Sequence, residues 1–175
     1  MNTQHSRKLS FGADQENACL RPAEPVILAA EDDDDHFLLL RLALDRAWIR
    51  HPLVRVTTGQ DALHYIEGTG PYSVRAEYPA PSLIFLDLNM PSMDGLDVLA
   101  ALHSAPEPCE IPIVVLSAWA DSLKLELAWK LGARECYKKP KEFSSLVQLV
   151  AEICRRWIGT ESISTAPSRA CLQVA

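Results

Sequence analysis

Short apolar runs alternate along the middle of the chain with longer stretches whose apolar residues recur at helical spacing. The apolar runs predict strands at Val26–Ala30, Leu53–Thr57, Leu83–Leu86 and Ile113–Leu116, with a weaker fifth strand at Glu135–Lys138. The other stretches predict helices at Phe37–Trp48, Asp61–Glu67, Leu96–His103, Asp121–Leu131 and Phe143–Trp157. The last of these helices is expected to bury one face, made of Phe143, Leu146, Val147, Val150, Cys154 and Trp157. Strands that alternate with helices, and that are apolar throughout, are typical of a parallel sheet covered on both faces. The pattern therefore predicts an α/β fold built on a five-stranded parallel sheet with helices on both faces.

The segments outside this alternation have a different composition. Gly68–Ser82 is rich in Gly and Pro, which predicts a loop. Residues 1–24 and 159–175 are polar and show no period, so they are predicted to be flexible tails on a single domain over 25–158.

Composition excludes several classes of protein. The 175 residues carry a net charge of -6, whereas binding to nucleic-acid phosphates needs a basic surface. No apolar run approaches the roughly 18 residues of a membrane span. The five cysteines are scattered and form no CxxC pair, which indicates free thiols in a reducing cytoplasm. We therefore expect a cytoplasmic protein with no nucleic-acid or membrane partner.

Polar residues follow four of the predicted strands. The acidic run Glu31–Asp35 follows the first strand, Asp87 the third, Ser117 ends the fourth, and Lys139 follows the fifth. The carboxyl ends of parallel strands meet at one edge of a sheet, where ligands bind. Clustered carboxylates attract Mg²⁺, and a carboxylate can accept a phosphoryl group when a metal and a lysine neutralise the charge. The pattern predicts a site for a phosphorylated aspartate.

Each feature also has a simpler interpretation when taken alone. The acidic run is typical of a solvated loop, and Asp35 is a candidate cap for a helix beginning near His36. Asp87, Ser117 and a lysine before proline are each common in turns or on surfaces. The histidines show no metal-ligand spacing and receive no role.

Four motifs, taken in order, resemble the receiver domains of response regulators. Val26 to Asp32 resembles their first strand and acidic pair, and Leu83 to Leu99, which contains Asp87, Pro91 and Gly95, resembles their phosphoacceptor segment almost residue for residue. Ile113 to Ala118 and the pair Lys139-Pro140 resemble their fourth-strand and fifth-strand motifs. The resemblance covers about 25–158 and implies a flavodoxin-like, doubly wound fold with strand order 2-1-3-4-5.

The resemblance also implies roles for particular residues. Asp87 would accept the phosphoryl group from a histidine kinase. Ser117 and the main-chain amide of Ala118 would bind the phosphoryl oxygens, and Lys139 would pair with Asp87. The Lys139–Pro140 bond would be cis. The implied cofactor is Mg²⁺, with these ligands: Glu31, Asp32, Asp87 and the main-chain carbonyl of Asn89.

Two positions depart from the family pattern. The aromatic residue expected three positions before the lysine is replaced by Cys136, and Tyr137 follows it, which places Tyr137 on the opposite face of the strand. Trp119 stands two residues after Ser117, where a polar residue is common, and we expect its indole to shield the acyl phosphate and lengthen its life. Because Cys136 replaces the expected aromatic residue, the family's usual coupling between the Ser117 hydroxyl and that residue is in question.

The resemblance implies a single-domain response regulator of a two-component phosphorelay, in a bacterial cytoplasm. It would have no enzymatic activity beyond its own phosphotransfer and dephosphorylation, and would signal to a downstream protein through a phosphorylation-dependent surface. The length of Gly68–Ser82 resembles receivers paired with phytochrome-type kinases. The last two helices offer a candidate dimer or partner patch, formed by Leu125, Trp129, Leu149 and Ile153.

Two other functions remain open at the level of the sequence. One is an interaction module with vestigial phosphorylation, which Cys136 favours and the four intact strand-end motifs disfavour. The other is a Mg²⁺-dependent aspartyl-phosphate phosphatase of the haloacid-dehalogenase type. Asn89 disfavours it, because that family carries a second Asp there for proton transfer.

Overall fold

Eleven elements make up the fold, and their order alternates between strand and helix. The computed structural model describes residues 25–118 and 122–159. The elements are β1 (Ile27–Ala30), α1 (Asp34–Arg46), β2 (Leu53–Val56), α2 (Gly59–Glu67), the 3₁₀ helix η1 (Gly70–Tyr72), β3 (Leu83–Leu86), α3 (Gly95–His103), β4 (Ile113–Ser117), α4 (Ser122–Lys130), β5 (Glu135–Lys138) and α5 (Phe143–Trp157).

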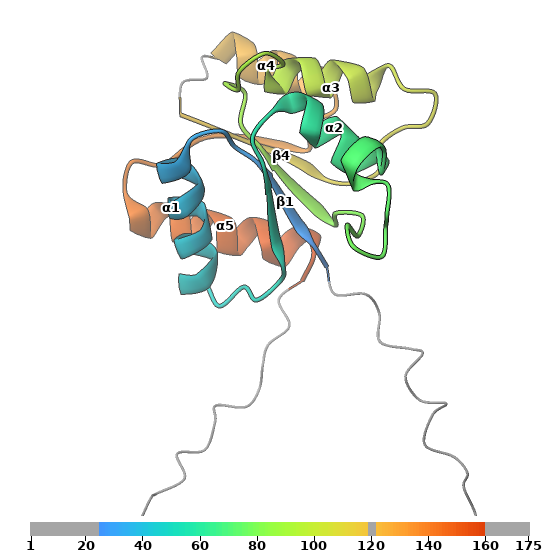
Figure 1. Ribbon diagram of the computed structural model, residues 1–175. Helices are drawn as coiled ribbons and strands as arrows, with labels where there is room; N and C mark the ends of the chain where they lie inside the picture. Colours follow the sequence, from blue (N-terminus) through green and yellow to red (C-terminus); the bar gives the residue numbers. More distant parts are fainter. Residues whose placement is uncertain (1–24, 119–121, 160–175) are drawn as a thin grey trace, which may run out of the picture.

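The five strands form one sheet in the order β2-β1-β3-β4-β5, and every neighbouring pair is parallel. The predicted sheet and strand order are therefore confirmed. Helices α1 and α5 cover one face, while α2, α3 and α4 cover the other (Figure 1). This arrangement leaves the carboxyl ends of β1, β3, β4 and β5 together at one edge.

Side chains of the central strands alternate between two hydrophobic cores. In β3, Ile84 and Leu86 pack with α2 and α3, whereas Leu83 and Phe85 pack with α1 and α5. All four residues of β3 are at most 2% exposed, so this strand is buried on both faces. The burial explains why β3 is apolar throughout. It also fixes the position of Asp87, which directly follows this buried strand.

The first helix begins earlier than the apolar pattern predicts. Its N-cap is Asp33, whose carboxylate accepts a 2.8 Å hydrogen bond from the backbone N–H of His36. The expectation that Asp35 caps the helix is therefore wrong, because Asp35 already lies within its first turn. Apolar periodicity cannot detect a polar first turn, so the prediction began at Phe37.

The buried face of α5 also differs from the prediction. Leu146, Val150, Ile153 and Cys154 face the core, and Ile153 is only 1% exposed. Phe143 and Trp157, predicted on that face, are 40% and 36% exposed. Ile153 therefore belongs to the core and not to a surface patch, because the stripe runs through positions i, i+4, i+7 and i+8 of this helix.

The segment between α2 and β3 is packed against the domain. Arg75 donates hydrogen bonds of 2.8 Å and 2.7 Å to the carbonyls of Tyr65 and Ile66, which lie at the end of α2. Gly68 ends that helix with a left-handed φ of 69°, and a Cβ atom there would lie 2.4 Å from the Arg75 guanidinium. The loop prediction holds. The loop also contains the short helix η1 and aromatic rings that pack against the ring of Tyr65 in tilted and edge-on arrangements.

No helix in the described part of the chain is both long enough and apolar enough to cross a membrane. The predicted tails, apart from Gly159, fall outside the described residues, as does Trp119.

Candidate functional site

Strand register brings the predicted site residues to one edge of the sheet. The backbone N–H of Asp87 donates to the carbonyl of Ala30 at 3.0 Å, which sets the end of β3 beside the end of β1. The N–H of Lys139 donates to the carbonyl of Ser117 at 3.0 Å and sets the end of β5 beside β4. Residues distant in sequence therefore share a small volume.

Asp87 is the centre of a hydrogen-bond network. Its Oδ1 accepts a 2.7 Å bond from the Ser117 hydroxyl and a 3.1 Å bond from the N–H of Asn89. The Asn89 side-chain amide in turn donates to the Ser117 hydroxyl at 3.0 Å. Asp87 is 5% exposed and Ser117 is fully buried, so these bonds fix the carboxylate in one orientation.

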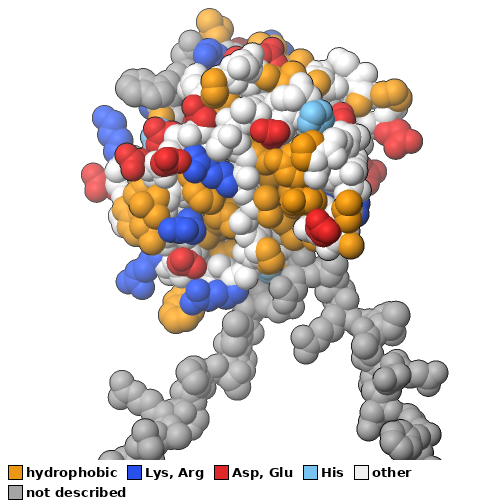
Figure 2. Space-filling view, in the orientation of Figure 1, with side chains coloured by type: hydrophobic (Ala, Val, Ile, Leu, Met, Phe, Trp, Pro, Cys, Tyr) orange, Lys and Arg blue, Asp and Glu red, His pale blue; other side chains and the backbone are white. Residues whose placement is uncertain are grey.

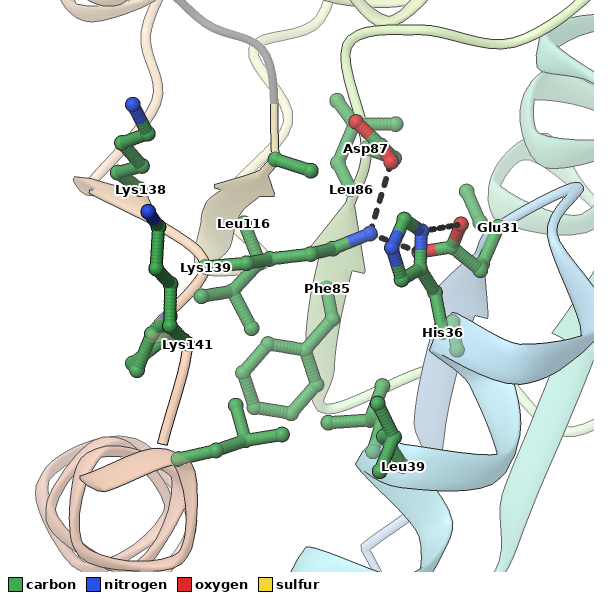
Figure 3. A pocket seen from close by; sticks show the side chains of 16 residues that line it. Glu31, His36, Leu39, Phe85, Leu86, Asp87, Leu116, Lys138, Lys139 and Lys141 are labelled. Carbon is green, nitrogen blue, oxygen red and sulfur yellow. Dashed lines mark hydrogen bonds and ion pairs between the residues drawn. The ribbon is translucent and has the colours of Figure 1, made fainter. Parts of the chain in front are cut away.

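Lys139 bridges two carboxylates. Its Nζ lies 2.8 Å from Asp87 Oδ2 and 2.5 Å from Glu31 Oε2, and its side chain is 15% exposed. The ammonium points toward both acids (Figure 3). A buried pair of like charges is costly unless a cation lies between them, and the ammonium of Lys139 meets that need here.

One oxygen of Glu31 accepts no hydrogen bond from the residues that the structure describes. Its Oε1 is buried and accepts no hydrogen bond from the described residues, while Oε2 is paired with Lys139. Burial raises the pKa of the Glu31 carboxyl, and the hydrogen bond and charge of Lys139 oppose that shift. The free oxygen is the clearest sign that this hollow is built to receive a further positive charge.

His36 is the site residue that sequence reasoning missed. Its Nδ1 lies 3.5 Å from Glu31 Oε1, at the start of α1 and inside the same hollow. Its position in the sequence could have indicated this place, because His36 lies in the first turn of a helix that follows the acidic end of a strand. Spacing rules for metal ligands do not detect a set that three separate elements assemble.

Arg55 is a second residue that sequence reasoning missed. Its guanidinium donates 2.9 Å bonds to the carbonyls of Glu31 and Asp32 and a 2.6 Å bond to the Asp34 carboxylate. The guanidinium also stacks on the Phe37 ring at 4.8 Å from the ring centroid. Arg55 therefore fastens the acidic loop to β2.

Other predicted residues lie at the margin of the site. Asp32 is exposed and falls outside the acid and histidine cluster found among the described residues, so its metal role stays a prediction. Ala118 lines the hollow, and the role of its amide also stays a prediction. The predicted cis bond before Pro140 is wrong, because the described chain contains no cis peptide. An X–Pro bond prefers trans by about 0.5–1 kcal/mol, which agrees with this result.

Gly95 holds the phosphoacceptor segment close to the start of α3. A Cβ atom at this position would lie 2.3 Å from the Asp87 carbonyl oxygen and 2.9 Å from the Cα of Leu88. Asp94 and Asp97 cap the N-terminus of α3 with a reciprocal capping box. The resemblance seen at Gly95 therefore has a steric cause, since only glycine permits this approach.

Cys136 and Tyr137 point to opposite faces of β5, as predicted. Cys136 packs in the core beneath α4, where burial raises the pKa of its thiol to about 11. Tyr137 packs on the α5 side and donates a hydrogen bond to Glu135. The hydroxyl of Tyr137 is thus engaged away from Ser117.

The site borders a cavity of about 520 Å³ between α1 and the β5–α5 loop. One end is polar, with Glu31, Asp87 and Lys139, and the other is lined by Leu39, Phe85 and similar side chains. Figure 3 shows the ammonium of Lys139 pointing into the polar end. The apolar end shields the acids from water on that side.

Comparison with known proteins agrees with this geometry. Residues 27–151 match the family model of the response regulator receiver domain, and the chain belongs to this family. It is 30% identical to the response regulator Rcp1 of Synechocystis over 81% of this chain and 94% of Rcp1. The Mn²⁺-bound form of Rcp1 superposes with a TM-score of 0.67 at 29% identity, covering 81% of this chain and 99% of Rcp1.

Two further structures come from light signalling. The response regulator RPA3017, in red light signaling of R. palustris, has a TM-score of 0.72 at 30% identity and covers 81% of this chain and 99% of its own. The phosphorylated cyanobacterial phytochrome response regulator RcpA has a TM-score of 0.69 at 34% identity, covering 83% and 100%. The chain is thus a receiver-domain response regulator of the two-component class.

The residues at the site fit a hard divalent cation. Carboxylate oxygens are the ligands that Mg²⁺ and Mn²⁺ accept, and two buried carboxylates lie here with one oxygen unpartnered. Lys139 supplies one positive charge against these two negative charges. The remaining negative charge and the free oxygen match a bound cation.

Proposed function

We propose that this chain is a single-domain response regulator that accepts a phosphoryl group on Asp87 from a histidine kinase. The observation that carries the proposal is the convergence on Asp87 of Ser117, Asn89 and Lys139, all within 3.1 Å of its carboxylate oxygens. An acidic nucleophile held by a hydroxyl, an amide and an ammonium suits phosphoryl transfer, which depends on positioning and charge neutralisation.

Each side chain has a task in that transfer. A carboxylate oxygen of Asp87 would attack the phosphorus of the kinase phosphohistidine, and the P–N bond would break so that the imidazole leaves as the aspartyl phosphate forms. Lys139 balances the charge of Asp87 before transfer and that of the phosphoryl group afterwards. The Ser117 hydroxyl, which now donates to Asp87, is placed to donate to a phosphoryl oxygen instead.

Glu31, Asp87 and the main-chain carbonyl of Asn89 would hold the metal, with Asp32 joining them. Mg²⁺ is the proposed ion, and it would neutralise charge on the phosphoryl oxygens. The Mn²⁺-bound form of the similar protein Rcp1 supports binding of a divalent ion.

A phytochrome-type histidine kinase is the proposed phosphodonor. The similarity to RcpA, a phytochrome response regulator, and to RPA3017 of red light signaling supports this partner. The match covers 99% of the RPA3017 chain and 100% of the RcpA chain, so it extends over the whole receiver in both.

Output would pass through the surface of the domain to a downstream protein in the cytoplasm. Phosphorylation would bias a pre-existing pair of conformations, because it adds charge beside Ser117 and Lys139. Catalysis on other substrates is not part of the proposal. The chain would act as a switch that catalyses only its own phosphotransfer and dephosphorylation.

Labelling with a small phosphodonor tests the proposal. Incubation with Mg²⁺ and acetyl phosphate is expected to add one phosphoryl group by mass spectrometry, and Asp87→Asn is expected to abolish the gain. Asp45→Asn, at an exposed acid in the last turn of α1, is the matched control and should label like the parent.

Two outcomes would contradict the proposed function. Absence of labelling in the parent would favour a module that only binds partners. Sustained release of phosphate from many phosphoesters would favour a phosphatase.

A further inference from the structure

His36 lies beside the phosphoacceptor, although the proposed transfer gives it no task. One ligand atom from each of Glu31, His36 and Asp87 falls within 4.8 Å of the other two. Figure 3 shows the imidazole ring next to the Lys139 ammonium, with one ring nitrogen directed toward Glu31. The hollow therefore offers a nitrogen ligand in addition to its carboxylates.

The free oxygen of Glu31 points independently to a ligand at this place. Glu31 is 5% exposed, and its Oε1 has no hydrogen-bond partner among the described residues. A buried charged oxygen left without a partner costs free energy, so a protein retains one where something binds. This same oxygen is the one that lies 3.5 Å from His36 Nδ1.

The distance suits two ligands of one ion. Ligands at about 2.1 Å from an octahedral ion lie about 3 Å apart when adjacent and about 4.2 Å apart when opposite. The 3.5 Å between Glu31 Oε1 and His36 Nδ1 falls inside that range. Small side-chain movements are therefore enough for both atoms to reach one ion.

Local structure holds the ring in place. The backbone N–H of His36 donates to Asp33, and Nδ1 lies 3.7 Å from an Asp33 oxygen. The groups that face the ring are thus Glu31, Asp33 and Lys139. The side chain is 32% exposed, so a hydrated ion can approach it from solvent.

We propose that His36 is a nitrogen ligand of the divalent-cation site and shifts its preference from Mg²⁺ toward first-row transition ions. Mg²⁺ favours oxygen ligands, whereas imidazole favours ions such as Ni²⁺, Cu²⁺ and Zn²⁺. The inference rests on the metal site of the proposed function, but it concerns which ion that site selects. If His36 were only an ion-pair partner of the acids, its removal would alter the affinity for all divalent ions alike.

The ratio of Ni²⁺ affinity to Mg²⁺ affinity separates a His36 that binds the ion from a His36 that only pairs with the acids. Calorimetric titration of the full chain with Ni²⁺ and with Mg²⁺ gives a ratio of affinities for the parent, His36→Asn and His103→Asn. His103 is an exposed histidine in the last turn of α3, so its variant controls for adventitious binding. Even outer-shell partners of a metal contribute about tenfold or more to affinity, and we expect the Ni²⁺ to Mg²⁺ ratio to fall by at least that factor in His36→Asn alone.

Pulsed electron paramagnetic resonance of bound Cu²⁺ tests for direct coordination. The parent and His103→Asn should show the nitrogen coupling of a bound imidazole, and His36→Asn and His36→Gln should lose it. Unchanged selectivity together with an unchanged nitrogen signal in both His36 variants would overturn the proposal. Acetyl phosphate labelling of the parent is scored separately, so failure of Asp87 to label would reject the phosphoacceptor role without deciding whether His36 binds metal.

Discussion

Gly95 shows how one residue sets the position of the reactive carboxylate. A methyl group here would press on the backbone of Asp87 and Leu88. We expect Gly95→Ala to lower the free energy of unfolding by about 1–3 kcal/mol, as overpacking does, and to slow acetyl phosphate labelling. Urea unfolding and a labelling time course measure the two effects.

Gly132→Ala is the matched control for that change. Gly132 has a φ of 100°, but no atom lies within 4 Å of the Cβ position. The control should therefore lose stability through backbone strain and label at the parental rate. If both variants labelled equally fast, Gly95 would have no special role at Asp87.

The positions of residues that follow strands could be predicted from their order in the chain, whereas the positions of residues that depend on packing could not. Asp87, Ser117 and Lys139 each follow a strand, and the parallel sheet makes their convergence foreseeable. His36 and Arg55 come from a helix and an edge strand, and their approach to Glu31 depends on helix packing. No periodicity in the sequence carries that information.

At the scale of elements, a buried carboxylate ties β5 to the end of α5. Glu135 accepts hydrogen bonds from Tyr137, from Trp157 at 2.6 Å and from Arg156, which lies 2.8 Å away. Burial of Glu135 opposes its ionisation, but these three donors outweigh burial and hold its pKa below the ordinary value of 4.5. The ionised form is therefore the one that stabilises the fold.

This tie predicts a pH-dependent loss in Glu135→Gln. Above the unfolded pKa near 4.5 the carboxylate contributes fully, so at pH 7 the variant should be less stable by about 1–3 kcal/mol. As pH falls through the lower folded pKa, the parent loses this contribution and the difference should shrink. Urea titrations from pH 7 down to acid measure it, and a difference that is constant with pH would contradict the assignment.

The buried stripe of α5 predicts unequal effects for two neighbouring positions. Ile153 is 1% exposed in the α1–α5 core, so Ile153→Ala should cost about 2–5 kcal/mol. Leu149 is only half-buried, and Leu149→Ala should cost clearly less. Thermal or urea unfolding of both variants checks the order, and equal losses would contradict the packing described here.

The error at Ile153 has a simple cause. Phe143 and Trp157 are large and apolar, so they dominate a face drawn from sequence alone. In the structure the first is 40% exposed, and the second binds Glu135 with its indole nitrogen. The sequence pattern therefore predicted Leu146, Val150 and Cys154 on the buried face of α5, but it missed Ile153.

At the scale of the whole molecule, two of the described helices carry groups of exposed apolar side chains. One group lies on α1 and just after it, where Leu38, Leu42 and Trp48 are exposed, and the other lies on α4, where Leu123, Leu127 and Trp129 are exposed. Figure 2 shows hydrophobic side chains interspersed with charges of both signs over one face. Groups of this kind mark candidate contact surfaces.

We propose that the α4 group, together with Leu125, contributes to a homodimer that responds to phosphorylation. β4 ends at Ser117, which bonds to Asp87, and α4 is the next helix along the chain, so we expect a change at the phosphoacceptor to reach α4. Because Ile153 lies in the core, it is not available for contact with a partner. We therefore place the proposed dimer surface on α4 and not on α5. Trp129, which is 56% exposed, is its largest side chain.

Sedimentation of charge variants tests this surface. With Mg²⁺ and beryllofluoride, a stable mimic of the phosphoryl group, the parent should shift its monomer–dimer balance, and Trp129→Glu should remove the shift by placing a charge in an apolar contact. Trp48→Glu makes the same change just after the end of α1, at a residue that is 73% exposed, and should behave like the parent. A parent that stays monomeric, or a Trp129→Glu variant that dimerises equally well, would refute a dimer through α4, because a buried glutamate cannot be accommodated there without cost.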